Sequence, residues 1–339
     1  MKKALITGVT GQDGFYLANY LLSLGYEVGG IVRRTSVPND FRIKALYTHP
    51  HFRIFEGDVT DLSSIESAVL SFGPDEFYHL AAFSHVGSSW GSPIATCDIV
   101  GLGTLNCLEA LRRAADECRF YFAGSSEQFG NTILDNKPLN ELSPMKPESP
   151  YAAAKVFGYN ITHVYRNSYN LFTSVGILMN HESPLRGEQF VTRKITKGLA
   201  KIACGKQKKL KLGNINAFRD WGFAGDFVVA MHKIINHHSP DDFVIATGET
   251  HSVSEFLSLT CQFFNLDPAQ VVEIDNALYR PKDVDKLLGD FSKAKNVLGW
   301  QPQTSFSELV EMMCKYDFAR ESGQNDLSNL LGVKLCTKN

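Results

Sequence analysis

Three side chains in the middle of the chain have the types and spacing that hydride transfer from an alcohol requires. Tyr151 and Lys155, in the sequence YAAAK, stand one turn apart on one face of a helix predicted over 151–169. A lysine ammonium near a phenol favours the phenolate, so we expect Lys155 to lower the pKa of Tyr151 and make it a general base. Ser125, at the end of the preceding predicted strand, adds a hydroxyl. On its own, the same spacing also fits an ordinary pair on a helix surface.

The stretch GSSEQFG (124–130) places a carboxylate, Glu127, directly after two serines at the end of an apolar run. A turn accounts for the glycines and for one serine, but it does not require a glutamate. Two interpretations follow from the residues: Glu127 is a second acid/base group, or it caps the following turn.

Three glycines precede the first predicted helix. Gly8, Gly11 and Gly14 lie in GVTGQDG, between a predicted strand and that helix. Glycines here allow a tight turn, let backbone N–H groups approach a pyrophosphate and let the helix pack close to the sheet. In the first strand–helix turn of a βαβ series, this pattern favours dinucleotide binding over a plain tight turn.

The end of the second predicted strand indicates which dinucleotide. Arg33 and Arg34 stand where an acidic residue would bind a free ribose 2′-hydroxyl. Guanidinium groups suit a 2′-phosphate through charge and paired donors, so we predict NADP; the alternative is that both arginines lie in solvent. Asp58, at the end of the third predicted strand, is placed to accept a hydrogen bond from an adenine amino group.

The elements that must position these residues alternate between strands and helices. Near-continuous apolar strands separated by helices predict an α/β fold, a Rossmann-type doubly wound parallel sheet with helices on both faces. The predicted strands are 3–8, 27–34, 52–59, 76–82, 119–124 and 172–180, and the predicted helices are 14–25, 63–72, 96–114 and 151–169.

The alternation loosens after about residue 180. We expect a dinucleotide-binding domain over 1–180, a smaller α/β substrate-binding region over 181–330 and a tail over 331–339, with some later segments, about 210–248, crossing back to the sheet. The elements predicted in this half are helices 190–204, 224–236, 253–265 and 306–321 and strands 210–213 and 242–248.

Composition limits the classes of partner. With 34 Lys and Arg against 36 Asp and Glu, the chain carries no bulk charge that would favour nucleic acid or a membrane surface. The seven cysteines lack the spacing of a disulfide framework or a zinc site, so we expect reduced thiols and no metal. We also expect no signal peptide and no run near the roughly 18 apolar residues of a membrane helix. These features predict a cytoplasmic enzyme.

Beyond these general features, the sequence resembles the GDP-mannose 4,6-dehydratase family of the extended short-chain dehydrogenase/reductases. The resemblance runs from ALITGVTGQDG to LGWQP, about 300 residues, and includes SHV (84–86), SPYAAAK (149–155), NHESPLRGEQFVTRKI (180–195), LGNINAFRDWG (212–222) and YRPKDVDKLLGD (279–290). The glycine turn and the tyrosine–lysine spacing are shared by other nucleotide-sugar enzymes, whereas the NHESP and RDWG blocks are more particular.

The resemblance implies a reaction and gives Glu127 a role in it. The implied activity is conversion of GDP-mannose to GDP-4-keto-6-deoxymannose, by C4 oxidation, loss of water across C5 and C6, and hydride return to C6. The catalytic residues implied are Ser125, Glu127, Tyr151 and Lys155, with Glu127 removing the C5 proton and protonating the departing C6 hydroxyl. It also implies deoxysugar biosynthesis and a homodimer or homotetramer.

The ligand contacts carried over by motif form two sets. The NADP contacts are Gly8, Thr10, Gly11, Gln12, Asp13, Gly14, Arg33, Arg34, Asp58, Val59, Leu80, Ala82, Ser84, Tyr151, Lys155, His181 and Arg186. The sugar-nucleotide contacts are Ser89, Asn180, Lys194, Arg219, Arg280 and Asp283, in which Arg219 and Arg280 suit a diphosphate bidentately.

Three departures from the family pattern keep alternatives open. Ser125 stands for a threonine, Trp90 for a phenylalanine and Asp283 for a glutamate expected near the nucleotide. A dehydratase acting on a GDP-linked heptose therefore stays possible, and an epimerase or decarboxylase of the same fold is a further alternative. A non-catalytic NADP-binding protein is a third, but it would not need Ser125, Tyr151 and Lys155.

Overall fold

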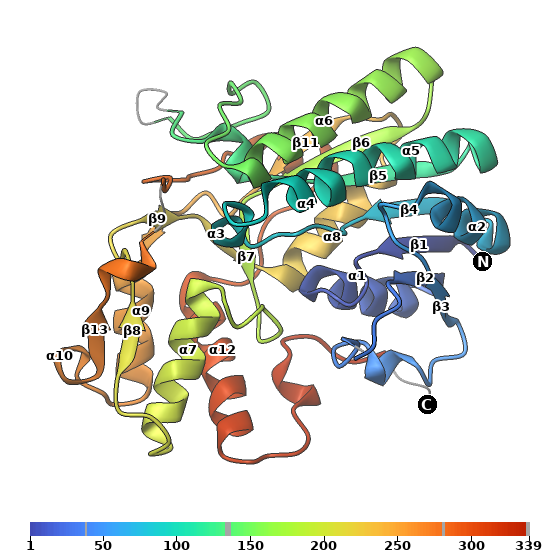
Figure 1. Ribbon diagram of the computed structural model, residues 1–339. Coiled ribbons are helices and arrows are strands. Elements are labelled where there is room, and N and C mark those ends of the chain that lie inside the picture. The colour runs from blue at the N-terminus through green and yellow to red at the C-terminus, as the bar shows by residue number, and fades with distance from the viewer. Residues whose placement is uncertain (38, 133–136, 280–281, 337–339) are drawn as a thin grey trace.

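A seven-stranded parallel sheet forms the centre of the computed structural model, which describes residues 1–37, 39–132, 137–279 and 282–336 (Figure 1). The spatial order is β11-β6-β5-β4-β1-β2-β3, so the chain runs outward from β1 to β3 and then continues on the other side at β4. Ligands bind at such a reversal of strand order. The strands are β1 (Lys3–Thr7), β2 (Glu27–Val32), β3 (Phe52–Glu56), β4 (Glu76–His79), β5 (Arg119–Ser125), β6 (Thr173–Leu178) and β11 (Asp242–Ile245).

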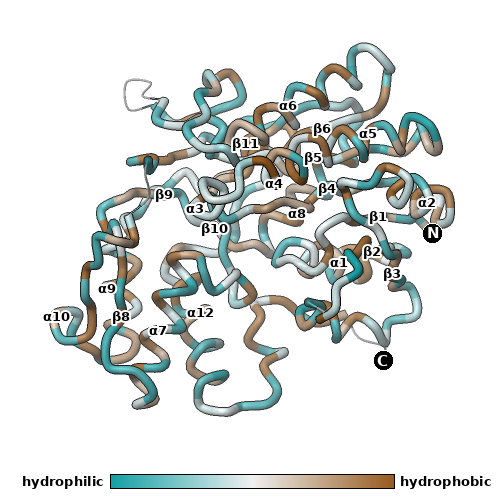
Figure 2. Tube along the Cα trace, in the orientation of Figure 1, coloured by the Kyte–Doolittle hydropathy of each residue, from teal (hydrophilic) through white to brown (hydrophobic). Residues whose placement is uncertain are grey.

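Helices cover both faces of this sheet, which confirms the predicted α/β architecture. On one face lie α2 (Leu62–Phe72), α5 (Gly103–Ala114) and α6 (Pro150–Tyr169), and their buried side chains form one apolar core with the strands (Figure 1). On the other face, α1 (Gln12–Ser23) and α8 (Ala224–Ile235) belong to a second core. Hydrophobic residues gather along the central strands between these layers (Figure 2).

The helix predicted over 96–114 is longer and less regular than expected. It begins as α4 (Pro93–Cys97), continues through a π-helical turn, η2 (Asp98–Leu102), and ends as α5. By length and composition this helix is apolar enough to cross a membrane, but half of its most apolar window is buried, and it packs against α2 and α6. The core helix of a globular protein has these same properties.

A smaller part of the molecule follows β6. Its helices α7 (Val191–Ala203), α9 (Val253–Phe263) and α12 (Phe306–Glu321) pack on one another, and α8 and β11 return to the main sheet. The remaining elements are η1 (Lys44–Leu46), α3 (Val86–Ser89), η3 (Ser126–Phe129), β7 (Asn180–Glu182), β8 (Leu210–Leu212), β9 (Phe218–Arg219), β10 (Trp221–Phe223), β12 (His251–Ser252), α10 (Pro268–Val271), β13 (Val272–Ile274), η4 (Asn276–Leu278), α11 (Ser292–Leu298) and η5 (Ser328–Leu330).

Several strands end earlier than the apolar pattern suggested, and two of these differences build the site. The strand predicted over 76–82 stops at His79, and residues 80–85 continue as an irregular segment. The strand predicted over 172–180 divides at Met179, and β7 leaves the sheet to pair with β10. Apolar residues beyond a strand end therefore line the site instead of extending the sheet.

Local capping fixes where the key helices begin and end. Ser149 caps α6, because its hydroxyl oxygen accepts from the Ala152 N–H at 3.1 Å. The same helix ends at Asn170, whose left-handed φ of 57° suits asparagine. These signals place Tyr151 and Lys155 in the first turns of α6.

Candidate active site

One large cleft lies along the carboxyl ends of the sheet strands and extends towards the smaller part. Its volume of about 1380 Å³ exceeds the roughly 300–1,000 Å³ of a typical single-ligand pocket, so it has room for a dinucleotide and a second nucleotide. The lining comes from the glycine turn, from the ends of β2, β4, β5 and β6, and from η3 and α6. Later segments add residues around 186–194 and 212–221, residues 277–279 and Asp283.

The glycine turn is tight and leaves the start of α1 open. Gly8 has a left-handed φ of +71°, and a Cβ there would lie 2.8 Å from the Ala81 nitrogen. A Cβ on Gly14 would lie 2.4 Å from the Gly8 carbonyl oxygen. Gly11 precedes the helix and offers no side-chain cap, so backbone N–H groups of the first turn face the cleft. This geometry fits a bound pyrophosphate.

At the start of α1, Asp13 lines the cleft and forms a half-buried ion pair with His181. The Asp13 Oδ2 lies 2.8 Å from His181 Nε2, and the other ring nitrogen lies 2.8 Å from the Met179 carbonyl oxygen. Burial alone would raise the pKa of Asp13, but His181, with smaller effects of Gln12 and Arg186, lowers that pKa to about 2. Burial would likewise lower the pKa of His181, and Asp13 raises it above its usual value. His181 thus holds α1 to β7 and has both ring nitrogens engaged.

The predicted adenosine contacts line the cleft where β2 and β3 end. Arg33 and Arg34 are exposed after β2 and border the cleft. Asp58 also lines it, but one of its carboxylate oxygens accepts from the N–H and hydroxyl of Thr60 at 2.9 and 2.8 Å. The remaining predicted contacts on this wall that border the cleft are Thr10, Gln12, Val59, Leu80, Ala82 and Ser84.

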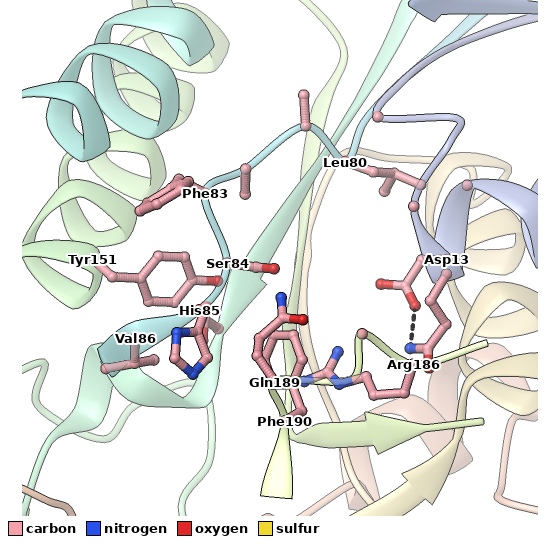
Figure 3. A pocket seen from close by; sticks show the side chains of 18 of the residues that line it. Asp13, Leu80, Phe83, Ser84, His85, Val86, Tyr151, Arg186, Gln189 and Phe190 are labelled. Carbon is pink, nitrogen blue, oxygen red and sulfur yellow. Dashed lines mark hydrogen bonds between the residues drawn. The ribbon is translucent and has the colours of Figure 1, made fainter. Parts of the chain in front are cut away.

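The four predicted catalytic side chains converge on the middle of the cleft. Ser125 ends β5 and caps η3, accepting from the Glu127 N–H at 3.3 Å. Lys155 is buried, and its ammonium donates to the Ala123 carbonyl at 2.6 Å while lying 5.8 Å from the centre of the Tyr151 ring. Tyr151 points into the cleft opposite Asp13 and Arg186 (Figure 3). Glu127 is half-buried and lines the same space.

The pKa expected for Tyr151 is wrong for this structure. Burial raises the pKa of Tyr151 to about 12, although its hydrogen bond with Ser125 acts in the opposite direction. Burial also lowers the pKa of Lys155 to about 7, which weakens the positive field on which the prediction relied. Lys155 is held next to the base, but it does not by itself bring the phenol into a working range.

Asn180 and Lys194, two of the predicted sugar-nucleotide contacts, line the cleft. The Asn180 Oδ1 is buried and accepts no hydrogen bond from the residues that the structure describes, which fits an acceptor waiting for a ligand donor. Lys194 projects from α7, and burial lowers its pKa. Arg280 lies outside the described residues.

Arg219 is arranged differently from the expected diphosphate clamp. Its Nη2 donates to Asp283 Oδ1 at 2.9 Å, and its Nη1 donates to the Phe218 and Val284 carbonyls at 2.9 and 2.7 Å. Both terminal nitrogens of the guanidinium therefore already have protein acceptors. Arg219 and Asp283 border the cleft as one ion pair, with 8% and 25% of their side chains exposed.

Two residues singled out in the sequence do not border the cleft. Ser89, predicted to contact the sugar nucleotide, is fully buried, and its hydroxyl donates to the Val86 carbonyl at 2.7 Å. Its place at the end of the one-turn helix α3 turns the side chain inward. Trp90 is partly exposed but is absent from the cleft lining, so it gives no structural reason to prefer a heptose.

Arg186 approaches the centre of the cleft from the segment after β7. Its guanidinium carbon lies 3.7 Å from the centre of the Phe190 ring, and its Nε lies 3.1 Å from Glu182 Oε2 (Figure 3). Glu182 is buried, and burial raises its pKa. Phe190 in turn contacts the ring of His85 edge-on. His85, Gln189 and Phe190 line the cleft near Tyr151 (Figure 3). The motif comparison included their sequence blocks but did not predict these side chains as site residues.

Arg42 is a site residue that sequence reasoning missed. Its guanidinium donates to the Thr10 carbonyl at 3.1 Å and to the Leu185 carbonyl at 2.9 Å, which ties the glycine turn to the segment after β7. Burial lowers the pKa of Arg42 to about 10. Arg42 follows an irregular stretch without periodicity, so no sequence pattern distinguishes it from a surface arginine.

A family model described as GDP-mannose 4,6 dehydratase matches residues 5–313 of the chain. The chain is 49% identical over 326 residues to GDP-mannose 4,6 dehydratase 2 of Arabidopsis thaliana, covering 93% of this chain and 87% of that protein. It is 43% identical over 350 residues to GDP-mannose 4,6-dehydratase of Vibrio cholerae, covering 93% of each chain.

Among solved structures, the fold is similar to that of dTDP-glucose 4,6-dehydratase from Bacillus anthracis in complex with NAD. The TM-score is 0.83 at 18% identity, with 95% of this chain and 98% of that chain covered. At this identity the likeness concerns the fold alone, a Rossmann-type doubly wound sheet.

Proposed function

Because the chain belongs to the GDP-mannose 4,6-dehydratase family, we propose that its cleft converts GDP-mannose to GDP-4-keto-6-deoxymannose. The enzyme is a hydro-lyase, a nucleotide-sugar 4,6-dehydratase. The observation that carries the proposal is the convergence of Ser125, Glu127, Tyr151 and Lys155 on one cleft that also contains the glycine turn.

The first step requires a base and a hydroxyl holder at C4 of the sugar. Tyr151 takes the C4 hydroxyl proton, and Ser125 orients that hydroxyl next to the phenol. An oxidised nicotinamide bound in this cleft would supply the hydride acceptor and a positive charge. A positive charge lowers the pKa of a phenol, in the direction that Tyr151, with its pKa of about 12, needs to become a base near neutral pH.

Glu127 acts after C4 has become a ketone. The C5 proton is then acidic, and the Glu127 carboxylate removes it. The carboxyl group so formed protonates the C6 hydroxyl, which leaves as water. Its place in η3, on the same cleft wall as Ser125, supports this role, because a single side chain must reach both C5 and C6.

We propose NADP as the cofactor. The glycine turn and the open start of α1 suit the pyrophosphate, and Arg33 and Arg34 suit a 2′-phosphate because both are exposed at the border of the cleft. The Asp13–His181 pair fixes the start of α1 at the wall of the cleft, and Arg186 lines the same cleft.

The sugar nucleotide binds on the far side of the cleft in this proposal. Asn180 offers an unused acceptor, Lys194 a cation, and the Arg219–Asp283 pair a fixed carboxylate with its counterion. Residues 1–180 with α8 and β11 would then form the cofactor half, and most of 181–330 would form the sugar-nucleotide half.

We propose that two copies of the chain associate through the helices of one sheet face. Five large apolar side chains are 41–77% exposed along α4, η2 and α6, which lie side by side (Figure 1): Ile94, Leu102, Phe157, Val164 and Tyr169. Exposed apolar groups gathered on adjacent helices are typical of interfaces between subunits.

All seven cysteines are free thiols, which supports a reducing compartment such as the cytoplasm.

The experiment that tests the proposal is incubation of the purified protein with NADP and a panel of GDP-, UDP- and CDP-sugars, with products read by mass. We expect loss of one water from GDP-mannose. A product of unchanged mass, as an epimerase would give, or turnover of UDP- or CDP-sugars alone, would contradict it.

A further inference from the structure

Asn131 lies behind the cleft at the point where three segments of the site meet. Its Nδ2 donates to Glu148 Oε2 at 2.7 Å and to the Asp283 carbonyl oxygen at 3.2 Å. Its Oδ1 accepts from the Asp285 N–H at 2.9 Å. The side-chain amide thus uses both donor hydrogens and its acceptor on partners far apart in the sequence. Asn131 does not line the cleft itself.

Two of the three segments carry the catalytic residues. Asn131 follows η3, the turn of Glu127, after a single residue, Gly130. Gly130 has a φ of +56°, and a Cβ there would lie 1.9 Å from the Lys146 carbonyl oxygen, so the chain must turn sharply at a glycine. Glu148 immediately precedes Ser149, the cap of the helix that carries Tyr151.

The third segment, residues 283–287, has little regular structure and depends on side chains for its position. Asn131 holds the Asp283 carbonyl and the Asp285 N–H, and Arg219 holds the Val284 carbonyl at 2.7 Å. The Asp285 carbonyl accepts from the Phe218 N–H at 2.8 Å. The Asp283 carboxylate, which borders the cleft, is therefore placed by contacts on either side of its own backbone.

We propose that Asn131 is a positioning residue that sets the distance between the Asp283–Arg219 pair and the catalytic side chains Glu127 and Tyr151. The proposal rests on the proposed function of the cleft, because it assigns segment 283–287 to the sugar nucleotide. Asn131 fixes this segment against η3 and against the start of α6 at once. The Asp283 carboxylate and the acid/base groups then stand at a fixed spacing from one another, and a bound sugar nucleotide can contact them at the same time.

The test substitution is Asn131→Asp, which keeps the size of the side chain and the acceptor for Asp285. It replaces the two donated hydrogen bonds by a carboxylate oxygen facing Glu148 and the Asp283 carbonyl, two acceptors that it repels. Losing contacts of this kind typically weakens an interaction about tenfold to a hundredfold, and we expect KM for GDP-mannose to rise by that factor. Affinity for NADP should stay unchanged, because the three contacts of Asn131 lie away from the glycine turn.

Two further variants separate positioning from general destabilisation. Asn131→Asp combined with Glu148→Gln places an amide donor opposite the new carboxylate, and we expect it to recover part of the lost KM. Asn140→Asp is the matched control in the same region, because the Asn140 side-chain oxygen only accepts, from Leu142 N–H and Ser143 Oγ, and an aspartate preserves that role. We expect wild-type KM and kcat for this control.

The measurements are KM and kcat for GDP-mannose, NADP binding by fluorescence, GDP binding by calorimetry and the melting temperature. A raised KM and weakened GDP binding with unchanged NADP affinity, partly rescued by Glu148→Gln, would support the proposal. Unchanged KM, an equal effect in Asn140→Asp, or parallel loss of NADP binding and melting temperature would overturn it. If the wild type does not dehydrate GDP-mannose, the proposed function fails instead, and GDP binding still tests the role of Asn131.

Discussion

At the scale of single residues, the two proposed bases differ in their surroundings. Tyr151 is 7% exposed and has a raised pKa, whereas Glu127 is half-buried at the end of a strand. Two titratable groups in such different environments can serve different steps of one reaction. Substitutions that keep the shape of each side chain should therefore stop the reaction at different points.

Glu127→Gln should separate oxidation from dehydration. Glutamine keeps the size and hydrogen bonding of the side chain but cannot take up a proton. The variant should still oxidise C4, seen as transient absorbance of the reduced cofactor, while dehydration slows by about 10²–10⁴. Tyr151→Phe is the matched comparison and should show no transient at all. Dehydration by Glu127→Gln at a near-normal rate would mean that Glu127 only caps its turn.

Arg33→Ala should remove most of the preference for NADP over NAD. The loss of one charge-assisted contact to phosphate corresponds to about 1.5–3 kcal/mol, roughly ten- to a hundredfold in affinity. Titration of each cofactor against the wild type and the variant measures this. Equal affinity of the wild type for NAD and NADP would contradict the assignment of Arg33 and Arg34 to a 2′-phosphate.

The sequence patterns that predicted site residues were those with a fixed spacing or a fixed place at a strand end. Gly8, Ser125 and Tyr151 belong to this group, and the structure brings them to one cleft. Arg42 and Asn131 act on partners more than a hundred residues away, through Leu185 in one case and Asp283 in the other. No local pattern reports such contacts, so only the tertiary structure could reveal them.

At the scale of elements, periodicity predicted nearly all of the long helices and central strands. It failed where burial continues past the end of a strand, as at Met179, because an apolar run looks the same whether it pairs or lines a cleft. It also missed the short pairs β7–β10 and β9–β12, whose strands of two or three residues are too short to show alternation. These short pairs place Asn180 and Arg219, so the proposed sugar-nucleotide side of the cleft was less predictable than the proposed cofactor side.

The Asp13–His181 contact joins α1 to β7 and should make stability depend on pH. The pKa of Asp13 is lowered from 3.8 to about 2, so its contribution is complete above about pH 4 and is lost as the pH falls towards 2. The pKa of His181 is raised, so its contribution is complete below about pH 6.5 and is lost as the pH rises through the raised value. The pair should therefore stabilise the fold most between about pH 4 and 6.5.

His181→Gln should accordingly lower the free energy of unfolding more at pH 5.5 than at pH 9. The Asp13 carboxylate is ionised at both pH values, so the difference between them comes from His181, whose raised pKa is passed between pH 5.5 and pH 9. Urea unfolding at the two pH values measures the difference. His51→Gln, at an exposed histidine, is the control and should show no such dependence. A loss of equal size at both pH values would mean that His181 acts through packing alone.

At the scale of the whole molecule, the exposed apolar side chains on α4, η2 and α6 predict association of two copies. Leu102→Lys combined with Val164→Lys places two charges on this surface, at side chains 49% and 47% exposed. We expect light scattering to show half the wild-type mass with an unchanged melting temperature of the cofactor-bound form. Leu142→Lys, at a side chain 93% exposed on another segment, should leave the mass unchanged. A monomeric wild type would contradict this interface.

The central claim is that one cleft oxidises C4, eliminates water and returns the same hydride to C6. The most direct test uses GDP-mannose carrying deuterium at C4, with NADP present in catalytic amount and the product analysed by mass and NMR. The account predicts a dehydrated product with deuterium at C6 and no net accumulation of reduced cofactor. Deuterium lost to solvent, or retained at C4 in a product that still contains its water, would contradict it.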